Sequence, residues 1–89
     1  MSSKRNPNVV TAQILEICAD GANKTRVVYQ ANLNSVKGTQ YLDSLTKSGF
    51  LEAIPDGSRF IYKTTPKGGK LREKLGQFQS MIENLYIHA

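Results

Sequence analysis

The chain has 89 residues, a net charge of +5 and one cysteine, Cys18. This length suits a single domain and leaves too little chain for a second core. One cysteine excludes a disulfide within the chain, no apolar run is long enough to cross a bilayer, and the N-terminal residues do not resemble a secretion signal. We therefore expect a cytoplasmic protein with no membrane partner.

Positive charge is concentrated in one stretch of the second half of the chain, where Glu73 is the only acid. The basic residues of that stretch are Arg59, Lys63, Lys67, Lys70, Arg72 and Lys74. Lys4 and Arg5 form a smaller basic group. A basic small domain favours a polyanionic partner, usually nucleic acid, although the same charge would also keep a small domain in solution.

A first helix is predicted from Asn6-Pro7 to Asp20-Gly21. Asparagine followed by proline is typical of an N-cap and a first helical position, and apolar residues then recur at helical spacing. Gly21 tolerates the left-handed conformation that ends many helices. A second, short helix opens at Asn23 or Lys24.

The Asn-Leu-Asn segment 32–34 predicts a tight turn, because asparagine tolerates turn conformations. Ser35 is expected to cap a third helix that runs to about Ser48 and ends at Gly49. Two helices separated by a short break are typical of the helix-turn-helix.

Residues 50–54 and 59–64 predict two strands joined by an Asp-Gly turn. Phe60 and Tyr62 share one face of the second strand. Thr65-Pro66 has the residues of a cap and first position for the last helix. From Leu71 onward the apolar residues alternate spacings of four and three, which is a heptad pattern. They are Leu71, Leu75, Phe78, Ile82 and Leu85.

This order of elements predicts a mainly α fold with a small β-hairpin, the winged helix-turn-helix. Residues 1–66 would form the winged-helix domain and residues 67–89 the C-terminal dimerisation helix, as one folding unit. The residue detail resembles small archaeal winged-helix DNA-binding proteins of the regulator and chromatin type. The matching segments span nearly the whole chain: Ile14-Leu15-Glu16-Ile17, Asp20-Gly21-Ala22, Lys24-Thr25-Arg26, Ala31-Asn32-Leu33-Asn34, Tyr41-Leu42, Leu45, Gly49-Phe50-Leu51, Tyr62-Lys63-Thr64-Thr65 and Lys67-Gly68.

Gly38 departs from the resembling proteins, which usually carry a leucine-like core residue at this place in the third helix. A glycine removes core volume and lowers helix propensity. Either a neighbouring side chain fills the gap or the helix bends.

The third helix is the expected reader of a DNA major groove, with its glycine and leucines on the buried side and its polar side outward. Gln40 suits adenine edges, Lys37 suits guanine or phosphate, and Val36 suits a thymine methyl. Asp43 would repel phosphate, so we expect contacts mainly from the N-terminal half. The expected contact residues of this helix are Ser35, Val36, Lys37, Gln40, Ser44 and Lys47.

Two further groups of DNA contacts are expected near this helix. Lys24, Thr25 and Arg26 open the second helix, which crosses the DNA backbone in the resembling proteins and would bind phosphates here. Arg59 lies at the tip of the hairpin, where an arginine suits a narrow minor groove. The charged residues of both groups are equally compatible with ordinary surface charges.

Lys67 and Lys70 lie in the first turns of the last helix, where positive charge opposes the helix dipole. A phosphate bound there, with Lys63 and Arg72 close by, would offset that cost. Alternatively, the lysine side chains extend away from the helix end into water.

The heptad face of the last helix has two possible partners: the first helix of the same chain, or the same helix of a second subunit. Met81, Tyr86 and Ile87 make this face wider than one intramolecular contact needs. We expect a homodimer whose interface is formed by Leu71, Leu75, Phe78, Ile82 and Leu85. The residues leave parallel and antiparallel pairing open, and the resemblance implies antiparallel pairing.

Catalytic and metal-binding patterns are missing from the sequence. His88 and Cys18 cannot supply the usual number of metal ligands, no base is placed to activate a serine, and the acids are scattered. We expect no enzymatic activity, metal or cofactor. The expected function is double-stranded DNA binding by a homodimer, as a nucleoid-associated regulator or chromatin protein. The alternative is a winged-helix protein-interaction module that binds no DNA.

Overall fold

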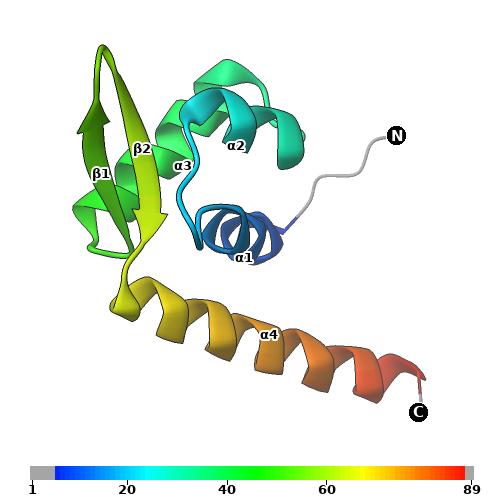
Figure 1. Cartoon of the computed structure of the whole chain (residues 1–89). Helices are drawn as coiled ribbons and strands as arrows, with labels where there is room; N and C mark the ends of the chain where they lie inside the picture. The colour runs from blue at the N-terminus through cyan, green and yellow to red at the C-terminus, as the bar shows by residue number, and fades with distance from the viewer. Residues whose placement is uncertain (1–5, 88–89) are drawn as a thin grey trace.

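The computed structural model describes residues 6–87, so Lys4, Arg5 and His88 lie outside the described residues. The elements are α1 (Pro7–Ile17), α2 (Lys24–Gln30), α3 (Ser35–Lys47), β1 (Leu51–Asp56), β2 (Arg59–Thr64) and α4 (Pro66–Ile87). Helices α1 to α3 form a cluster with the hairpin on one flank, and α4 runs beneath α1 and extends past it (Figure 1). The predicted order of a mainly α fold with a hairpin is confirmed.

Asparagine side chains cap the first three helices. The Oδ1 atoms of Asn6 and Asn23 accept hydrogen bonds from backbone amides of the first turns of α1 and α2, both at 2.8 Å. The prediction that Ser35 caps α3 is wrong by one residue. Asn34 has extended backbone angles and accepts from the Lys37 amide at 2.7 Å, so Ser35 is the first helical residue.

Helix α3 ends in a Schellman motif, in which Gly49 adopts φ 84°. The Phe50 amide donates to the Leu45 carbonyl at 2.9 Å, and the Gly49 amide donates to the Thr46 carbonyl at 3.1 Å. Phe50 therefore completes the helix end instead of opening the strand, and the predicted strand 50–54 is shifted to Leu51–Asp56.

The two strands pair antiparallel from Leu51↔Thr64 to Asp56↔Arg59. The Tyr62 amide and carbonyl bond to Ala22 at 2.8 and 3.0 Å, and therefore point away from β1. Because hydrogen-bonded and non-hydrogen-bonded pairs alternate, the Pro55↔Phe60 pair is also non-hydrogen-bonded. Proline lacks an amide hydrogen, so it is tolerated at this position and β1 continues two residues beyond the predicted end.

The core lies between α1, α2, α3 and the base of the hairpin. Its most deeply buried side chains are Ile14, Leu15, Cys18, Val27, Leu42 and Leu51. Burial raises the pKa of the Cys18 thiol to about 11. The thiol is thus protonated at neutral pH and acts as a small core residue.

The two halves of α4 have different surroundings. Its first half is held on α1, where Leu71 packs against the core and the Arg72 guanidinium forms an ion pair with Glu16. In its second half, Phe78 is 55% exposed and Leu85 is 59% exposed. Within residues 6–87, no helix has the length and apolar content needed to cross a bilayer.

Candidate nucleic-acid interface

The outer face of α3 is not covered by the rest of the described chain. Gly38, Leu42 and Leu45 are buried, as the helical period predicts. The residues that were expected to contact DNA from this helix are all exposed: Ser35, Val36, Lys37, Gln40, Ser44 and Lys47. Val36 is 67% exposed, although it is apolar. This face combines hydrogen-bonding side chains with one apolar, methyl-bearing side chain, and both kinds can contact base edges in a major groove.

Val28 of α2 fills the space that Gly38 leaves. A Cβ atom at position 38 would lie 2.5 Å from the Val28 Cγ2 atom, well inside van der Waals contact. Of the two alternatives from the sequence, the filled gap is therefore correct, and α3 is one continuous helix from Ser35 to Lys47. The glycine lets α2 and α3 approach closely at the turn that joins them.

We expect Gly38→Ala to destabilise the protein by about 1–3 kcal/mol, because overpacking costs more than the helix propensity that alanine adds. In a Val28→Ala background, which removes the methyl in contact, Gly38→Ala should be neutral or stabilising. Urea unfolding of the two single variants and the double variant measures this coupling. Additive effects of the two substitutions would contradict the contact.

The wing and the start of α2 converge at one hollow of about 300 Å³. Lys24 and Thr25 line it from α2, and Arg59 and Phe60 line it from the hairpin. Three of the expected DNA contacts thus meet, although 34 positions separate Thr25 from Arg59 in the sequence. Arg26 is directed elsewhere, because its Nη1 atom donates to the Gly21 carbonyl at 3.4 Å.

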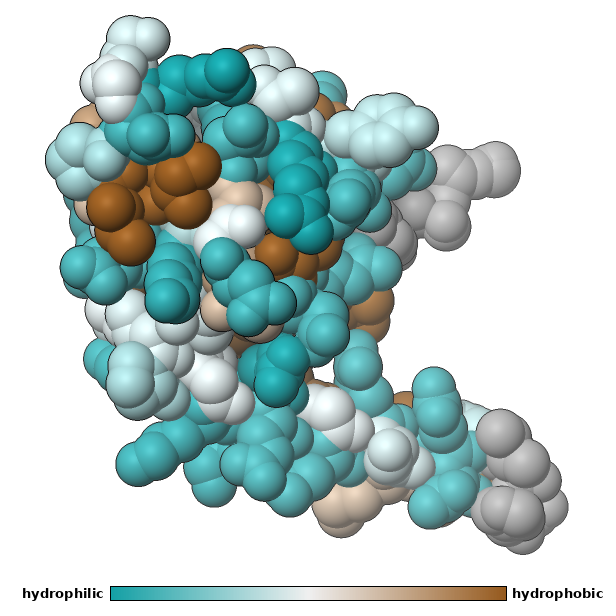
Figure 2. Space-filling model, viewed as in Figure 1, coloured by the Kyte–Doolittle hydropathy of each residue, from teal (hydrophilic) through white to brown (hydrophobic). Residues whose placement is uncertain are grey.

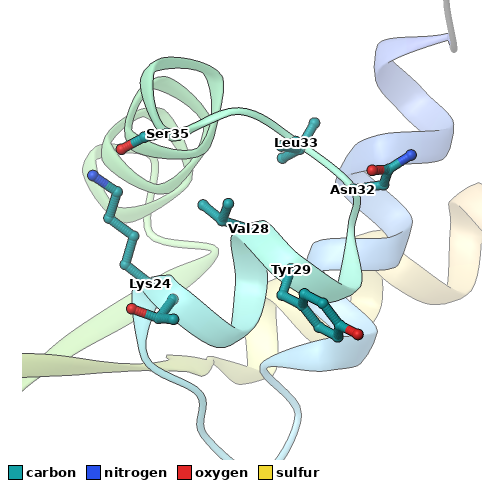
Figure 3. Close-up of a pocket in the computed structure, with 7 residues that line it drawn as sticks. Lys24, Val28, Tyr29, Asn32, Leu33 and Ser35 are labelled. Atoms are coloured by element: carbon teal, nitrogen blue, oxygen red, sulfur yellow. The ribbon is translucent and has the colours of Figure 1, made fainter.

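A second hollow of about 600 Å³ lies between α2 and the turn that leads into α3. Lys24 and Thr25 line this hollow too, together with Ser35 at the start of α3. In Figure 3 the Lys24 side chain extends across the opening toward Ser35, while the Tyr29 ring lies at the opposite end. Lys24 therefore connects the wing hollow to the first turn of α3, so the expected contacts of α2, α3 and the wing form one continuous surface.

A family model described as winged helix-turn-helix matches residues 4–83. The chain belongs to the winged helix-turn-helix family. The chain is similar to Sso10a-2, a DNA-binding protein from Sulfolobus solfataricus, with 37% sequence identity. Its crystal structure matches with a TM-score of 0.89, and the alignment covers 94% of this chain and 88% of that chain.

More distant winged helix-turn-helix structures share the fold. The transcriptional regulator BldR from Sulfolobus solfataricus is 17% identical with a TM-score of 0.81, and the alignment covers 90% of this chain and 60% of BldR. The homodimeric DNA-binding domain of Mb0332 from Mycobacterium bovis is 19% identical with a TM-score of 0.66, covering 93% of this chain and 76% of that domain. No protein with a curated function matches the chain.

Lys67 has partners within the winged helix-turn-helix itself. Its Nζ atom donates to the Ser48 carbonyl at 2.8 Å and lies 4.8 Å from the centroid of the Phe50 ring. The positive charge therefore sits at the C-terminal end of α3, where it is favourable. This contact offsets the cost of a lysine at the start of α4 without a phosphate. Lys63 and Lys70 remain exposed, and their contact with DNA remains a prediction, as does that of Lys67.

The segment 48–50 and the segment 65–68 together form a tight connection that we call the α3–α4 junction. The Thr65 hydroxyl donates to the Gly49 carbonyl at 2.6 Å, and the Thr65 amide donates to the Phe50 carbonyl at 3.1 Å. A Cβ atom at Gly68 would lie 2.1 Å from that Phe50 oxygen. The junction fixes the direction of α4 relative to α3.

Sequence reasoning missed two exposed aromatic residues of this surface. Tyr29 is 84% exposed at the end of α2, and Phe60 is 50% exposed on the wing. The alternation of the second strand had placed Phe60 on the face of Tyr62. The signal that was lacking is the length of the hairpin, which carries Phe60 beyond the core while the base of the same face stays buried.

Proposed function

We propose that this chain binds double-stranded DNA as a homodimer and acts as a transcription regulator or a chromatin protein. The observation that carries the proposal is the uncovered outer face of α3, continuous with the basic start of α2 and with the wing. Two facts support it: the net charge of +5 and the 37% identity to Sso10a-2, a DNA-binding protein.

In this proposal α3 lies in the major groove, which is about 12 Å wide and admits one helix. Lys37 and Gln40 contact base edges, and Val36 packs against a thymine methyl. Ser35, Lys24 and Thr25 hold the phosphates that flank the groove and so position α3. The wing then reaches the adjacent minor groove with Arg59.

The Lys37→Ala, Gln40→Ala double variant tests the assignment of α3. Because a good bidentate base contact contributes about 1–3 kcal/mol, we expect its affinity for duplex DNA to fall by about tenfold or more. Fluorescence anisotropy with a labelled duplex measures the affinity, and circular dichroism checks that the helices remain.

The matched control is Lys74→Ala, Gln77→Ala, which removes the same residue types from exposed positions of α4. It should bind DNA nearly as tightly as the unmodified protein. Equal losses in the two double variants would mean that only net charge matters, and unchanged binding of the α3 variant would remove this helix from the interface.

The exposed apolar residues in the second half of α4 are the basis for proposing a homodimer. Phe78, Ile82 and Leu85 continue the heptad of Leu71 and Leu75, but the chain's own core covers only the start of that series. Met81 and Tyr86, at 67% and 77% exposure, flank it. An apolar stripe of this kind is unfavourable in water and suits a second α4. Leu71 thus serves mainly its own subunit, and the proposed dimer contact is centred on residues 78–85.

A further inference from the structure

The hairpin ends in an apolar pair directly below its tip. Pro55 and Phe60 face each other across the strands, next to the closing pair Asp56↔Arg59. Their pair is non-hydrogen-bonded, the type in which side chains across a hairpin lie closest. Gly57 makes the turn with φ 63°, which keeps the end of the hairpin narrow. The result is a compact apolar unit on a projecting, two-stranded arm.

Phe60 is not part of the hydrophobic core. Along the face that it shares, Leu51 is 2% exposed, Tyr62 is half-buried and Phe60 is 50% exposed. The two bonds from Tyr62 to Ala22 hold the base of β2 against the chain that precedes α2. Phe60 lies two residues before Tyr62, nearer the tip of the hairpin. Its position relative to α2 is therefore fixed, while half of its surface remains exposed.

Phe60 lies at a hollow that basic side chains also line. It lines the wing hollow with Lys24, Thr25 and Arg59. Asp56 and Arg59 face each other across the strands, and both lie on the other face of the hairpin from Phe60. Figure 2 shows apolar surface over the hairpin surrounded by hydrophilic side chains. Ile54, which is 37% exposed, lies on the face of the hairpin opposite to Phe60.

An exposed apolar ring at a hollow lined by Lys24 and Arg59 matches the minor groove of DNA, where base edges and deoxyribose lie between two rows of phosphates. Architectural proteins insert apolar wedges such as phenylalanine or proline there, partly unstack a base step and bend the duplex. An apolar protein partner would cover Lys24 without supplying a counter-charge. Charge complementarity and continuity with the α3 surface therefore favour DNA as the occupant.

We propose that Phe60, backed by Pro55, is a minor-groove wedge that bends DNA beside the site of α3. This inference rests on the proposed function, because the wing reaches a minor groove only when α3 is docked. The most favourable steps are pyrimidine–purine steps, which kink most easily.

The test uses the full chain at saturating concentration on a duplex of about 30 base pairs with two central TpA steps. Energy transfer between dyes at the two ends reports bending, and 2-aminopurine at the TpA adenines reports unstacking. The unmodified protein should raise both signals. Phe60→Ala should lose most of both signals while its affinity falls about tenfold or less, and Phe60→Leu should retain them, because leucine is also a wedge residue.

Ile54→Ala is the control on the opposite face of the hairpin and should behave as the unmodified protein. Bending that is equal in the unmodified protein and in Phe60→Ala, or absent in both, overturns the wedge and leaves the α3 assignment intact. A Phe60→Ala chain that sediments as a monomer would assign Phe60 to a contact between protein copies and would also overturn it. If the unmodified protein bound no duplex at all, the wedge and the proposed function would fail together.

Discussion

Replacing Gly68 with alanine is expected to lower the free energy of unfolding by about 1–3 kcal/mol or more. The added Cβ would lie 2.1 Å from the Phe50 carbonyl oxygen, and this neighbour is backbone, so no flexible side chain can move aside. The carbonyl also accepts the Thr65 amide hydrogen bond at 3.1 Å. Any shift of α4 that relieves the clash therefore weakens the α3–α4 junction.

Gly69→Ala is the matched control, because a Cβ at Gly69 meets nothing within 4 Å. It should stabilise the protein by up to about 1 kcal/mol, the gain in helix propensity over glycine. The same substitution at two adjacent glycines of one helix would thus change the free energy of unfolding in opposite directions. Urea unfolding at one protein concentration measures both, since the stability of a dimer depends on concentration. Stabilisation by Gly68→Ala would mean that the junction is not tightly packed.

The second large effect is expected from Phe78→Asp combined with Ile82→Asp. Each substitution would place a carboxylate in the proposed apolar interface between two α4 helices. A homodimer carries each substitution twice, so at a cost of about 2 kcal/mol for each of the four carboxylates the dimer dissociation constant should rise by about five orders of magnitude or more. The winged-helix part should remain folded, because Phe78 is 55% exposed and Ile82 38% exposed in the single chain. Sedimentation velocity measures the oligomeric state.

Gln77→Asp with Ser80→Asp adds the same two charges to exposed positions of α4 outside the heptad face. This control should remain a dimer. If the Phe78 and Ile82 variant also stayed a dimer, the subunits would meet at a different surface, and the role proposed for residues 78–85 would be wrong.

Local signals in the sequence predicted most of the fold. Asparagine and Thr-Pro caps, glycines at helix ends and an Asp-Gly turn act over a few residues, so they can be recognised without the structure. The errors are also local. Asn34 and Ser35 are both good caps, and sequence alone does not decide between neighbours. Phe50 suits a strand by composition, but its amide completes the end of α3.

The outward face of α3 followed from helical geometry, whereas the roles of Lys67 and Gly38 did not. The carbonyl that Lys67 binds belongs to Ser48, and the side chain that occupies the space beside Gly38 belongs to Val28 of another helix. Such contacts depend on how separate elements pack. The convergence of Lys24 and Arg59 on one hollow has the same origin, since the pairing of Ala22 with Tyr62 brings the wing to α2.

The dependence of duplex binding on salt concentration tests most directly the proposal that this chain binds double-stranded DNA as a homodimer. A surface that carries Lys24, Lys37, Lys47 and Arg59 in each of two subunits should displace counterions from several phosphates. The logarithm of the association constant should then fall against the logarithm of salt concentration with a slope of about −4 or steeper. A protein that sediments as a dimer but shows no measurable duplex binding at about 50 mM salt, where such contacts are strong, would contradict the claim and indicate a protein-interaction module instead.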